Sequence, residues 1–273
     1  MKQLLVLSGK GGTGKTTLAS ALIAIMEIEA FADADVDAPN LHLTQSFPPP
    51  TQEEAYYGMN KAIIDETQCT QCGLCQNACR FDAIKEYKVN AYACEGCALC
   101  AHICPVSAIK MQPNVAGYRT LYKDERVFST ANLKMGQGNS GLLVTEVKKA
   151  LKPYSETYPY AIIDGSPGIG CPVIASISGV DYVLMVSEPS VSGLHDLSRV
   201  VKTTRKLGVP MMVCVNKYDV HLGNTQKIID YCKEQVIPYV GSIPYDSRRM
   251  TDDKSTYSIA VHQLSENIKQ MTK

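Results

Sequence analysis

The chain has 273 residues, and its 27 basic and 27 acidic side chains leave no formal net charge. This length suits one large α/β domain with a small additional module, and the balanced charge gives no electrostatic reason to expect nucleic acid as a partner. Because no apolar run approaches about 18 residues and no cleavable signal precedes the first apolar segment, we expect a cytoplasmic protein without a membrane partner.

The first motif is a glycine-rich stretch between an apolar run, Leu4–Leu7, and a helix-forming segment, Leu18–Ile23. Its spacing of one glycine, four residues and Gly-Lys-Thr matches a phosphate-binding loop, with an ordinary glycine-rich turn as the alternative. In such a loop the backbone N–H groups and Lys15 bind phosphates, while Thr16 binds Mg²⁺. The predicted nucleotide-binding residues here are Gly9, Lys10, Gly11, Gly12, Thr13, Gly14, Lys15, Thr16 and Thr17.

A second lysine, Lys10, follows the first glycine, and an ordinary phosphate loop does not need it. With this lysine the stretch resembles the altered loop of the MinD/ParA/nitrogenase-iron-protein superfamily, Gly-Lys-Gly-Gly-x-Gly-Lys-Thr/Ser-Thr/Ser. The resemblance implies an ATPase in which Lys10 reaches across a homodimer to the partner's phosphates. It therefore implies catalytic roles for Lys10 and Lys15, and a dimer with ATP and Mg²⁺ at its interface.

An acidic segment follows the next predicted strand, Ala30–Asp33. Carboxylates at the C-terminal end of a strand, beside a phosphate loop, can order the attacking water or the Mg²⁺ shell. Aligned on the family, this segment is the first switch, with Asp35 at the water-orienting position and Asp37 as a second candidate. A solvated acidic turn is the alternative for both. The proline-rich segment Phe47–Glu54 then indicates a linker or an edge segment.

Eleven cysteines in a cytosolic chain indicate metal binding rather than disulfides, and eight of them form two runs with the spacing C-x2-C-x2-C-x3-C. The flanking segments Phe81–Lys85 and Val106–Lys110 recur at the same offset of 25 residues. This duplication resembles a bacterial two-cluster ferredoxin, in which the fourth cysteine of each run binds the other cluster. The resemblance implies one 4Fe–4S cluster on Cys69, Cys72, Cys75 and Cys104, and a second on Cys94, Cys97, Cys100 and Cys79.

The first run departs from the ferredoxin pattern because Arg80 stands where proline is usual, although no ligand is lost. Zinc is the alternative metal, but zinc sites usually consist of two separated C-x2-C pairs. We expect residues 61–111 to form an inserted ferredoxin-type domain of α+β class. Residues 1–60 and 112–273 would then form one discontinuous ATPase domain.

The chain beyond the insertion predicts a strand over residues 119–128, and a glycine-rich loop that opens a helix ending at Leu151. In the nitrogenase iron protein this loop carries a cluster-binding cysteine, and Asn139 occupies that position here. The next strand, Tyr160–Asp164, precedes a segment that resembles the family's second switch. The resemblance gives Asp164 the role of holding Mg²⁺ through water, with a strand-end cap as the alternative.

Three further cysteines lie outside the two runs. Cys171 follows Asp164 at the separation of the other interface ligand in the nitrogenase iron protein, which suggests a metal or redox role. A small buried residue before a helix is the alternative for Cys171. Cys214 and Cys232 are expected to be small core residues.

The last third of the chain predicts strands at 183–187 and 211–215, a helix at 193–207 and a C-terminal helix at 258–273. In the superfamily the asparagine at the end of the second of these strands, here Asn216, bonds the adenine edge. Residues 243–246 resemble the second base-contacting loop, which adds Asp246. Ordinary strand-end turns are the alternative for both. The C-terminal helix lacks the bulky apolar face of a membrane-targeting helix.

Taken over the whole chain, these features predict a mostly parallel sheet with helices on both faces and nucleotide at the C-terminal strand ends. Permanent ligation by eight cysteines favours an ATP-gated electron carrier that serves an unidentified redox partner or metalloprotein. One alternative is a metallocluster assembly or insertion factor resembling Mrp-type scaffolds. Another is a nucleotide- and redox-dependent switch that positions a partner.

Overall fold

The computed structural model describes residues 1–246 and 255–273, which form two compact units. The first unit comprises Met1–Glu53, Thr120–Ala131 and Gly141–Lys273, and the second comprises Glu54–Arg119 and Asn132–Ser140. The unit boundaries fall within three strands, β3 (Gln52–Tyr57), β8 (Val115–Lys123) and β9 (Val127–Leu133).

Within the described residues, the largest sheet has nine strands in the order β13-β12-β11-β1-β10-β2-β9-β8-β3. Its parallel part consists of β1 (Lys2–Leu7), β2 (Ala30–Ala34), β10 (Tyr160–Gly165), β11 (Tyr182–Ser187), β12 (Met211–Asn216), β13 (Tyr239–Ile243) and β9. The central strand β1 lies between β10 and β11, so the C-terminal ends of the strands that carry the predicted site meet at one edge. A mostly parallel α/β sheet, as expected, is confirmed.

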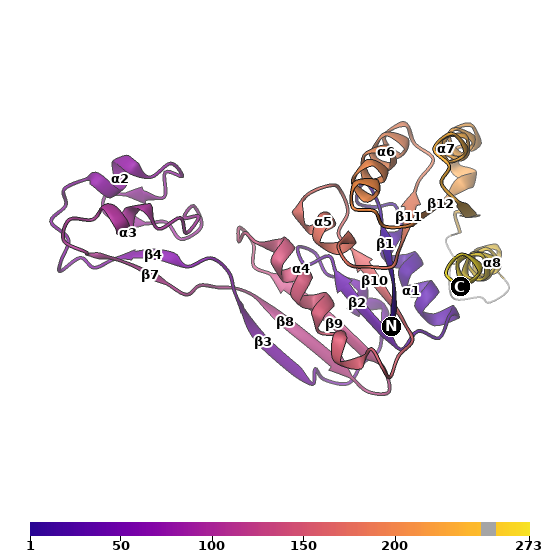
Figure 1. Cartoon of the computed structure of the whole chain (residues 1–273), viewed down its shortest axis with the longest axis horizontal. Helices are drawn as coiled ribbons and strands as arrows, with labels where there is room; N and C mark the ends of the chain where they lie inside the picture. Colours follow the sequence, from indigo (N-terminus) through magenta and orange to yellow (C-terminus); the bar gives the residue numbers. More distant parts are fainter. Residues whose placement is uncertain (247–254) are drawn as a thin grey trace. The chain divides into compact units, whose positions relative to one another are not determined.

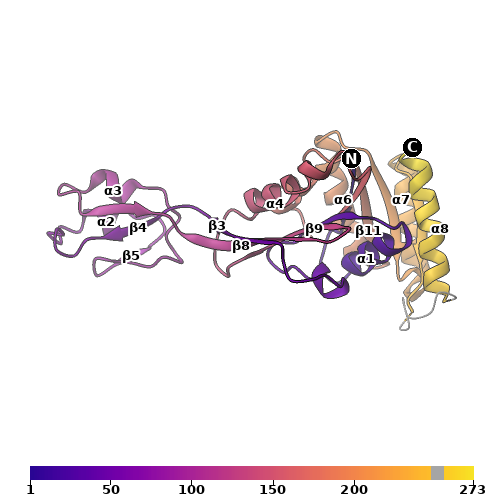
Figure 2. The same ribbon diagram turned by 90° about the horizontal axis from the view of Figure 1, so that it is seen from below.

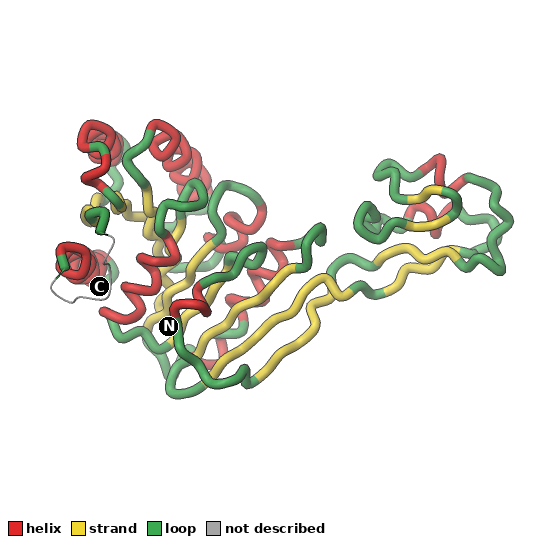
Figure 3. The backbone as a smooth tube through the Cα atoms, turned by 180° about the vertical axis from the view of Figure 1, so that it is seen from behind, coloured by secondary structure: helices red, strands yellow, loops and turns green. Residues whose placement is uncertain are grey.

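Helices cover both faces of this sheet (Figures 1 and 3). Leu4 and Val6 of β1 pack in one core cluster with α1 (Lys15–Ile25) and α8 (Thr256–Met271). Alternation along the strand turns Leu5 and Leu7, both fully buried, to the opposite face. Figure 2 shows α4 (Ser140–Lys149) and α6 (Val191–Lys206) on the other side of the strands from α1. The helices α5 (Cys171–Ile177) and α7 (Leu222–Glu234) complete the helical layers.

The segment after the insertion differs from the expected single strand over 119–128 because it forms two neighbouring strands, β8 and β9. A turn at Asp124 separates them, where the Asp124 carboxylate accepts the backbone N–H of Arg126 at 2.7 Å. This turn depends on a local side-chain bond that apolar periodicity does not reveal. The segment expected to be a linker or edge becomes the edge strand β3 from Gln52 onward.

The second unit repeats one backbone pattern at the offset of 25 residues that its sequence shows. It contains β4 (Lys61–Ile64) antiparallel to β7 (Ile109–Gln112), and the hairpin β5 (Ile84–Lys85) and β6 (Lys88–Val89). The short helices α2 (Leu74–Ala78) and α3 (Leu99–Ile103) occupy equivalent positions in the two copies. Positive φ angles repeat in three pairs at the same offset: Gln71 and Gly96, Gly73 and Ala98, Asp82 and Ser107.

Among the described helices, none is both long enough and apolar enough to cross a membrane.

Candidate functional site

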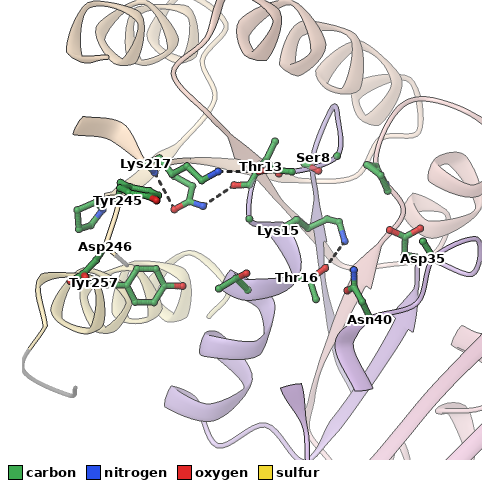
Figure 4. Close-up of a pocket in the computed structure, with 18 residues that line it drawn as sticks. Ser8, Thr13, Lys15, Thr16, Asp35, Asn40, Lys217, Tyr245, Asp246 and Tyr257 are labelled. Carbon is green, nitrogen blue, oxygen red and sulfur yellow. Dashed lines mark hydrogen bonds between the residues drawn. The ribbon is translucent and has the colours of Figure 1, made fainter. Parts of the chain in front are cut away.

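A cavity of about 440 Å³ lies at the C-terminal edge of the parallel sheet, around the glycine-rich loop between β1 and α1 (Figure 4). Seven of the nine predicted loop residues line it: Gly11, Gly12, Thr13, Gly14, Lys15, Thr16 and Thr17. Gly14 has a φ of 85°, and a Cβ atom at this position would lie 2.3 Å from Nδ2 of Asn216. Only glycine therefore fits the last turn before α1.

The predicted phosphate- and Mg²⁺-binding side chains meet at the end of β10. Asp164 is fully buried, and its Oδ1 lies 2.5 Å from Nζ of Lys15, which is only 6% exposed. Thr16 donates its hydroxyl to Oδ2 of the same carboxylate at 2.5 Å. A buried carboxylate, a lysine and a hydroxyl are thus gathered at the N-terminus of α1, where the helix dipole also favours anions.

The first acidic segment is organised by Asp33, a residue that sequence reasoning missed. This carboxylate is fully buried and accepts the backbone N–H groups of Asp35, Asn40 and Leu41 at 3.0, 2.8 and 2.9 Å. Burial and the nearby Asp164 carboxylate raise the pKa of Asp33. Because Asp33 binds the backbone at both ends of residues 35–41, it fixes the loop from which Asp35 faces the cavity.

Asp35 lines the cavity on the same side as Lys15 and Thr16, as Figure 4 shows. Burial raises its pKa to about 6, against the opposing effect of the Lys15 charge. A carboxylate with this pKa is ionised at neutral pH. Its pKa is also close enough to 7 for the carboxylate to accept a proton from water. Asp37, the second candidate, is exposed and is absent from the cavity lining formed by the described residues.

Lys10 turns toward the start of α6. Its ammonium lies 2.5 Å from Oε1 of Glu188 and donates to Oγ of Ser192 at 2.8 Å. Its neighbour Gly9 packs so closely that a Cβ atom there would lie 2.5 Å from Cβ of Asp196. The first glycine of the motif is therefore required by packing against α6.

The other end of the cavity is formed by residues from β12 and the segment after β13. Asn216 donates Nδ2–H to the Thr13 carbonyl at 2.7 Å, and Lys217 donates to the Gly12 carbonyl at 3.1 Å. These bonds connect the end of β12 to the phosphate loop. Asp246 also lines the cavity, together with its neighbour Tyr245 from the predicted base-contacting segment (Figure 4). Tyr257 of α8 lines it too, and the sequence did not identify this residue.

The eight cysteines of the second unit line two separate cavities. Cys79, Cys94, Cys97 and Cys100 line a cavity of about 310 Å³, and Cys69, Cys72, Cys75 and Cys104 line one of about 20 Å³. Three sulfurs accept backbone N–H bonds, from Gln71 to Cys69, from Ala83 to Cys79 and from Ala108 to Cys104, at 3.3 to 3.4 Å. Within residues 1–246 and 255–273, no three His, Cys, Asp or Glu side chains are placed to hold a single metal ion.

The remaining cysteines differ in exposure. Cys171 is exposed as the first residue of α5, beside Gly141 at the start of α4. Cys214 and Cys232 are fully buried, and burial raises the pKa of their thiols to about 12 and about 11. Such thiols stay protonated and unreactive at neutral pH.

Comparison with known proteins gives related sequences as well as related folds. The family model for the CobQ/CobB/MinD/ParA nucleotide-binding domain matches residues 4–256. An uncharacterised protein of Methanocaldococcus jannaschii is 32% identical over 276 residues, covering 98% of this chain and 96% of its own length. A second uncharacterised protein of that organism is 29% identical over 277 residues, with coverages of 89% and 86%.

Among the solved structures with a similar fold, two MinD proteins illustrate the likeness at low sequence identity. The MinD cell division protein of Aquifex aeolicus has a TM-score of 0.55 and 18% identity, with coverage of 100% of this chain and 98% of its own. The septum site-determining protein MinD of Pyrococcus horikoshii, complexed with Mg-ADP, has a TM-score of 0.56 and 17% identity, with coverages of 99% and 97%. At these identities the similarity concerns the fold.

Proposed function

The chain belongs to the CobQ/CobB/MinD/ParA family of nucleotide-binding domains, and on that premise we propose that it hydrolyses ATP to control electron transfer through two 4Fe–4S clusters to a partner protein. The nucleotide occupies the cavity around the glycine-rich loop, and the clusters occupy the two cysteine-lined cavities.

The nucleotide half of the proposal assigns a role to each side chain at the end of β10. Lys15 leaves Asp164 for the phosphate oxygens, which frees the Asp164 carboxylate and the Thr16 hydroxyl to hold Mg²⁺ directly or through water. When bound, Mg²⁺ neutralises charge on the phosphates. Asp35 orients the attacking water and accepts its proton. Asn216 and Asp246 contact the adenine base of the nucleotide at the other end of the cavity.

The observation that carries the cluster half is the division of the eight cysteines between two cavities. Each cavity takes three cysteines from one run and the fourth from the other, which is the interlocked pattern of a two-cluster ferredoxin. Backbone N–H bonds to Cys69, Cys79 and Cys104 suit thiolates, because such donors stabilise negative sulfur. The clusters would supply one-electron chemistry. We place the ferredoxin-type domain at residues 61–111, from the start of β4 to within β7.

We further propose that two copies close around nucleotide, with Lys10 of each copy exchanging Glu188 for the phosphates bound by the other. Closure would present the cluster-bearing domain to its redox partner, and hydrolysis would release it. Free cysteine quartets require a reducing compartment, which favours the cytoplasm.

A second candidate function is assembly or insertion of a metallocluster. One observation favours it, because Cys171 is exposed at the start of α5 and belongs to neither quartet. On this alternative, a Cys171→Ser variant loses cluster transfer to an apo-acceptor and keeps electron transfer.

The deciding experiment is iron analysis with EPR spectroscopy of the dithionite-reduced protein, prepared without oxygen, with and without MgATP. The proposal expects about eight irons per chain and two interacting 4Fe–4S signals whose shape or potential changes with MgATP. Two clusters indifferent to MgATP would contradict ATP gating. Loss of iron on addition of ATP would favour assembly, and a chain that binds zinc alone would end the cluster proposal.

A further inference from the structure

The two cysteine quartets lie in different electrostatic surroundings. We call the set Cys69, Cys72, Cys75 and Cys104 site 1, and the set Cys79, Cys94, Cys97 and Cys100 site 2. Among the described residues that line site 1, none carries a charged side chain apart from the cysteines themselves. The lining of site 2 includes Arg80 and Glu95.

Lys61 adds a second cation to site 2. It lies on β4, is only 9% exposed, and donates its ammonium to the backbone carbonyl of Cys94. The charge is therefore fixed at a residue that contributes a sulfur to site 2. Because a partly buried charge is weakly screened by solvent, its field acts on the site more strongly than that of a surface lysine.

The internal repeat allows the charges around the two sites to be compared at equivalent positions. Asp65 and Asn90 are equivalent, because each carbonyl accepts the N–H of the first cysteine of its run at 3.0 Å. Their side chains also make the same bond, to the N–H of Thr67 at 3.0 Å and of Tyr92 at 2.9 Å. The Asp65 carboxylate also accepts the Thr67 hydroxyl at 2.6 Å, a bond that suits its ionised form.

Site 1 thus has an anion at the turn where site 2 has a neutral amide. After the fourth cysteine of each run the difference has the same sign, because Pro105 lines site 1 and Arg80 lines site 2. At both of these positions site 2 is the more positive of the two. At a third position the difference is reversed, because Glu95 lines site 2 where Thr70 lines site 1. Glu95 offsets one of the two cations, Lys61 and Arg80, and leaves site 2 with the more positive surroundings.

We propose that Lys61 and Arg80 make site 2 the electron-accepting site of the pair, an inference that rests on the proposed function because it requires a 4Fe–4S cluster at each site. Added negative charge is stabilised where the surroundings are positive. A one-electron donor protein reduces site 1 or site 2, and an electron on site 1 passes to site 2. Site 1 is then oxidised by one electron and site 2 is reduced by one, while no bond forms or breaks and no proton moves.

The test is a redox titration of the iron-loaded full-length protein followed by EPR spectroscopy. The unaltered protein should show two potentials separated by at least 59 mV, which corresponds to a tenfold preference of one electron for one site. Lys61→Met should lower the higher potential and leave the lower one unchanged. Asp65→Asn should raise the lower potential and leave the higher one unchanged. Each variant therefore reduces the difference between the two potentials, one by lowering the higher potential and the other by raising the lower one.

Arg80→Pro places the residue of the other copy at this position and should act in the same direction as Lys61→Met. It guards against a folding defect in the Lys61 variant. The matched control is Lys85→Met, which removes an equal charge whose exposed ammonium pairs with Asp82, and both potentials should remain in place. The inference is overturned if the Lys61 and Arg80 variants leave the higher potential unchanged or shift the lower one. Fewer than about eight irons per chain in the unaltered protein would instead overturn the proposed function on which this inference rests.

Discussion

At Asp164, a fully buried carboxylate depends on Lys15 for its only ion pair among the described residues. Removing one member of a buried pair leaves an uncompensated charge and typically costs about 3–5 kcal/mol. We therefore expect Lys15→Met to lower the free energy of unfolding by about that amount, measured by urea denaturation without nucleotide.

The double variant Lys15→Met/Asp164→Asn tests this explanation, because it removes both charges. It should be less destabilised than Lys15→Met alone, which a double-mutant cycle would show as a favourable coupling energy. Equal destabilisation of the single and double variants would mean that Lys15 contributes by packing and not by charge.

The raised pKa of Asp35 predicts a pH dependence for ATP hydrolysis. Because burial raises this pKa to about 6, the carboxylate is protonated below that value and cannot accept a proton from water. The hydrolysis rate should fall as the pH drops through about 6, and it should level off above this value. Asp35→Asn should remove the inflection and reduce kcat by about 10²-fold or more.

Asp37→Asn is the matched control, because Asp37 is acidic, exposed and only two residues away. Its pH profile should retain the inflection near 6. Loss of the inflection in the Asp37 variant, with retention in the Asp35 variant, would transfer the role to Asp37.

Residues such as Lys15 and Thr16 could be predicted because their roles follow from a short motif between a strand and a helix. Asp33 could not, since its role depends on backbone groups as far away as Leu41. Lys217 is a stronger case, because its bond to the Gly12 carbonyl joins residues 205 positions apart. A pattern within one sequence does not contain such a contact.

At the level of elements, α4 and α5 are joined by one buried lysine. Lys148 donates its ammonium to the carbonyls of Ala175, Ser176 and Ser178 at 3.0, 2.7 and 2.6 Å, and so satisfies the C-terminal end of α5. Burial lowers the pKa of Lys148 to about 8, which leaves it mostly charged at neutral pH. We expect Lys148→Met to lower the free energy of unfolding by about 1–3 kcal/mol, because three carbonyls lose their donor.

The neighbouring Lys149 provides the control, since it is exposed and pairs only with Glu146 among the described residues. Lys149→Met should change stability by less than about 0.5 kcal/mol in the same thermal or urea measurement. Similar losses for both lysines would indicate a general effect of charge on α4.

Several elements of the first unit followed from apolar runs and glycines, as in β1, α1 and β10, where buried residues are consecutive. The helix α7 and the individual strands and helices of the second unit were not predicted. The hairpin of β8 and β9 escaped prediction because its turn rests on the Asp124 carboxylate within an otherwise strand-forming segment. The repeat of the second unit was visible in the cysteine spacing. The contribution of Lys61 to the charge around site 2 could not be predicted, because it depends on the hydrogen bond from Lys61 to the Cys94 carbonyl, 33 residues away.

For the whole molecule, the central prediction is that nucleotide controls association of two chains. Lys10 is held within its own chain by Glu188 at 2.5 Å and Ser192 at 2.8 Å, so it must exchange these partners to reach phosphates bound by another copy. Without nucleotide we expect the mass of a single chain, 29.8 kDa, and with MgATP twice that value, by light scattering after gel filtration.

Lys10→Ala should remain a single chain in MgATP, because the dimer loses a cation at each nucleotide, while its own phosphate loop still binds nucleotide through Lys15 and backbone N–H groups. Lys202→Ala removes an exposed lysine of α6 and should dimerise normally. Binding of a fluorescent ATP analogue separates the two possible causes of a monomer. A Lys10 variant that binds the analogue and still dimerises would show that association does not require this lysine, and the exchange of Glu188 for phosphate would then have no role in closure.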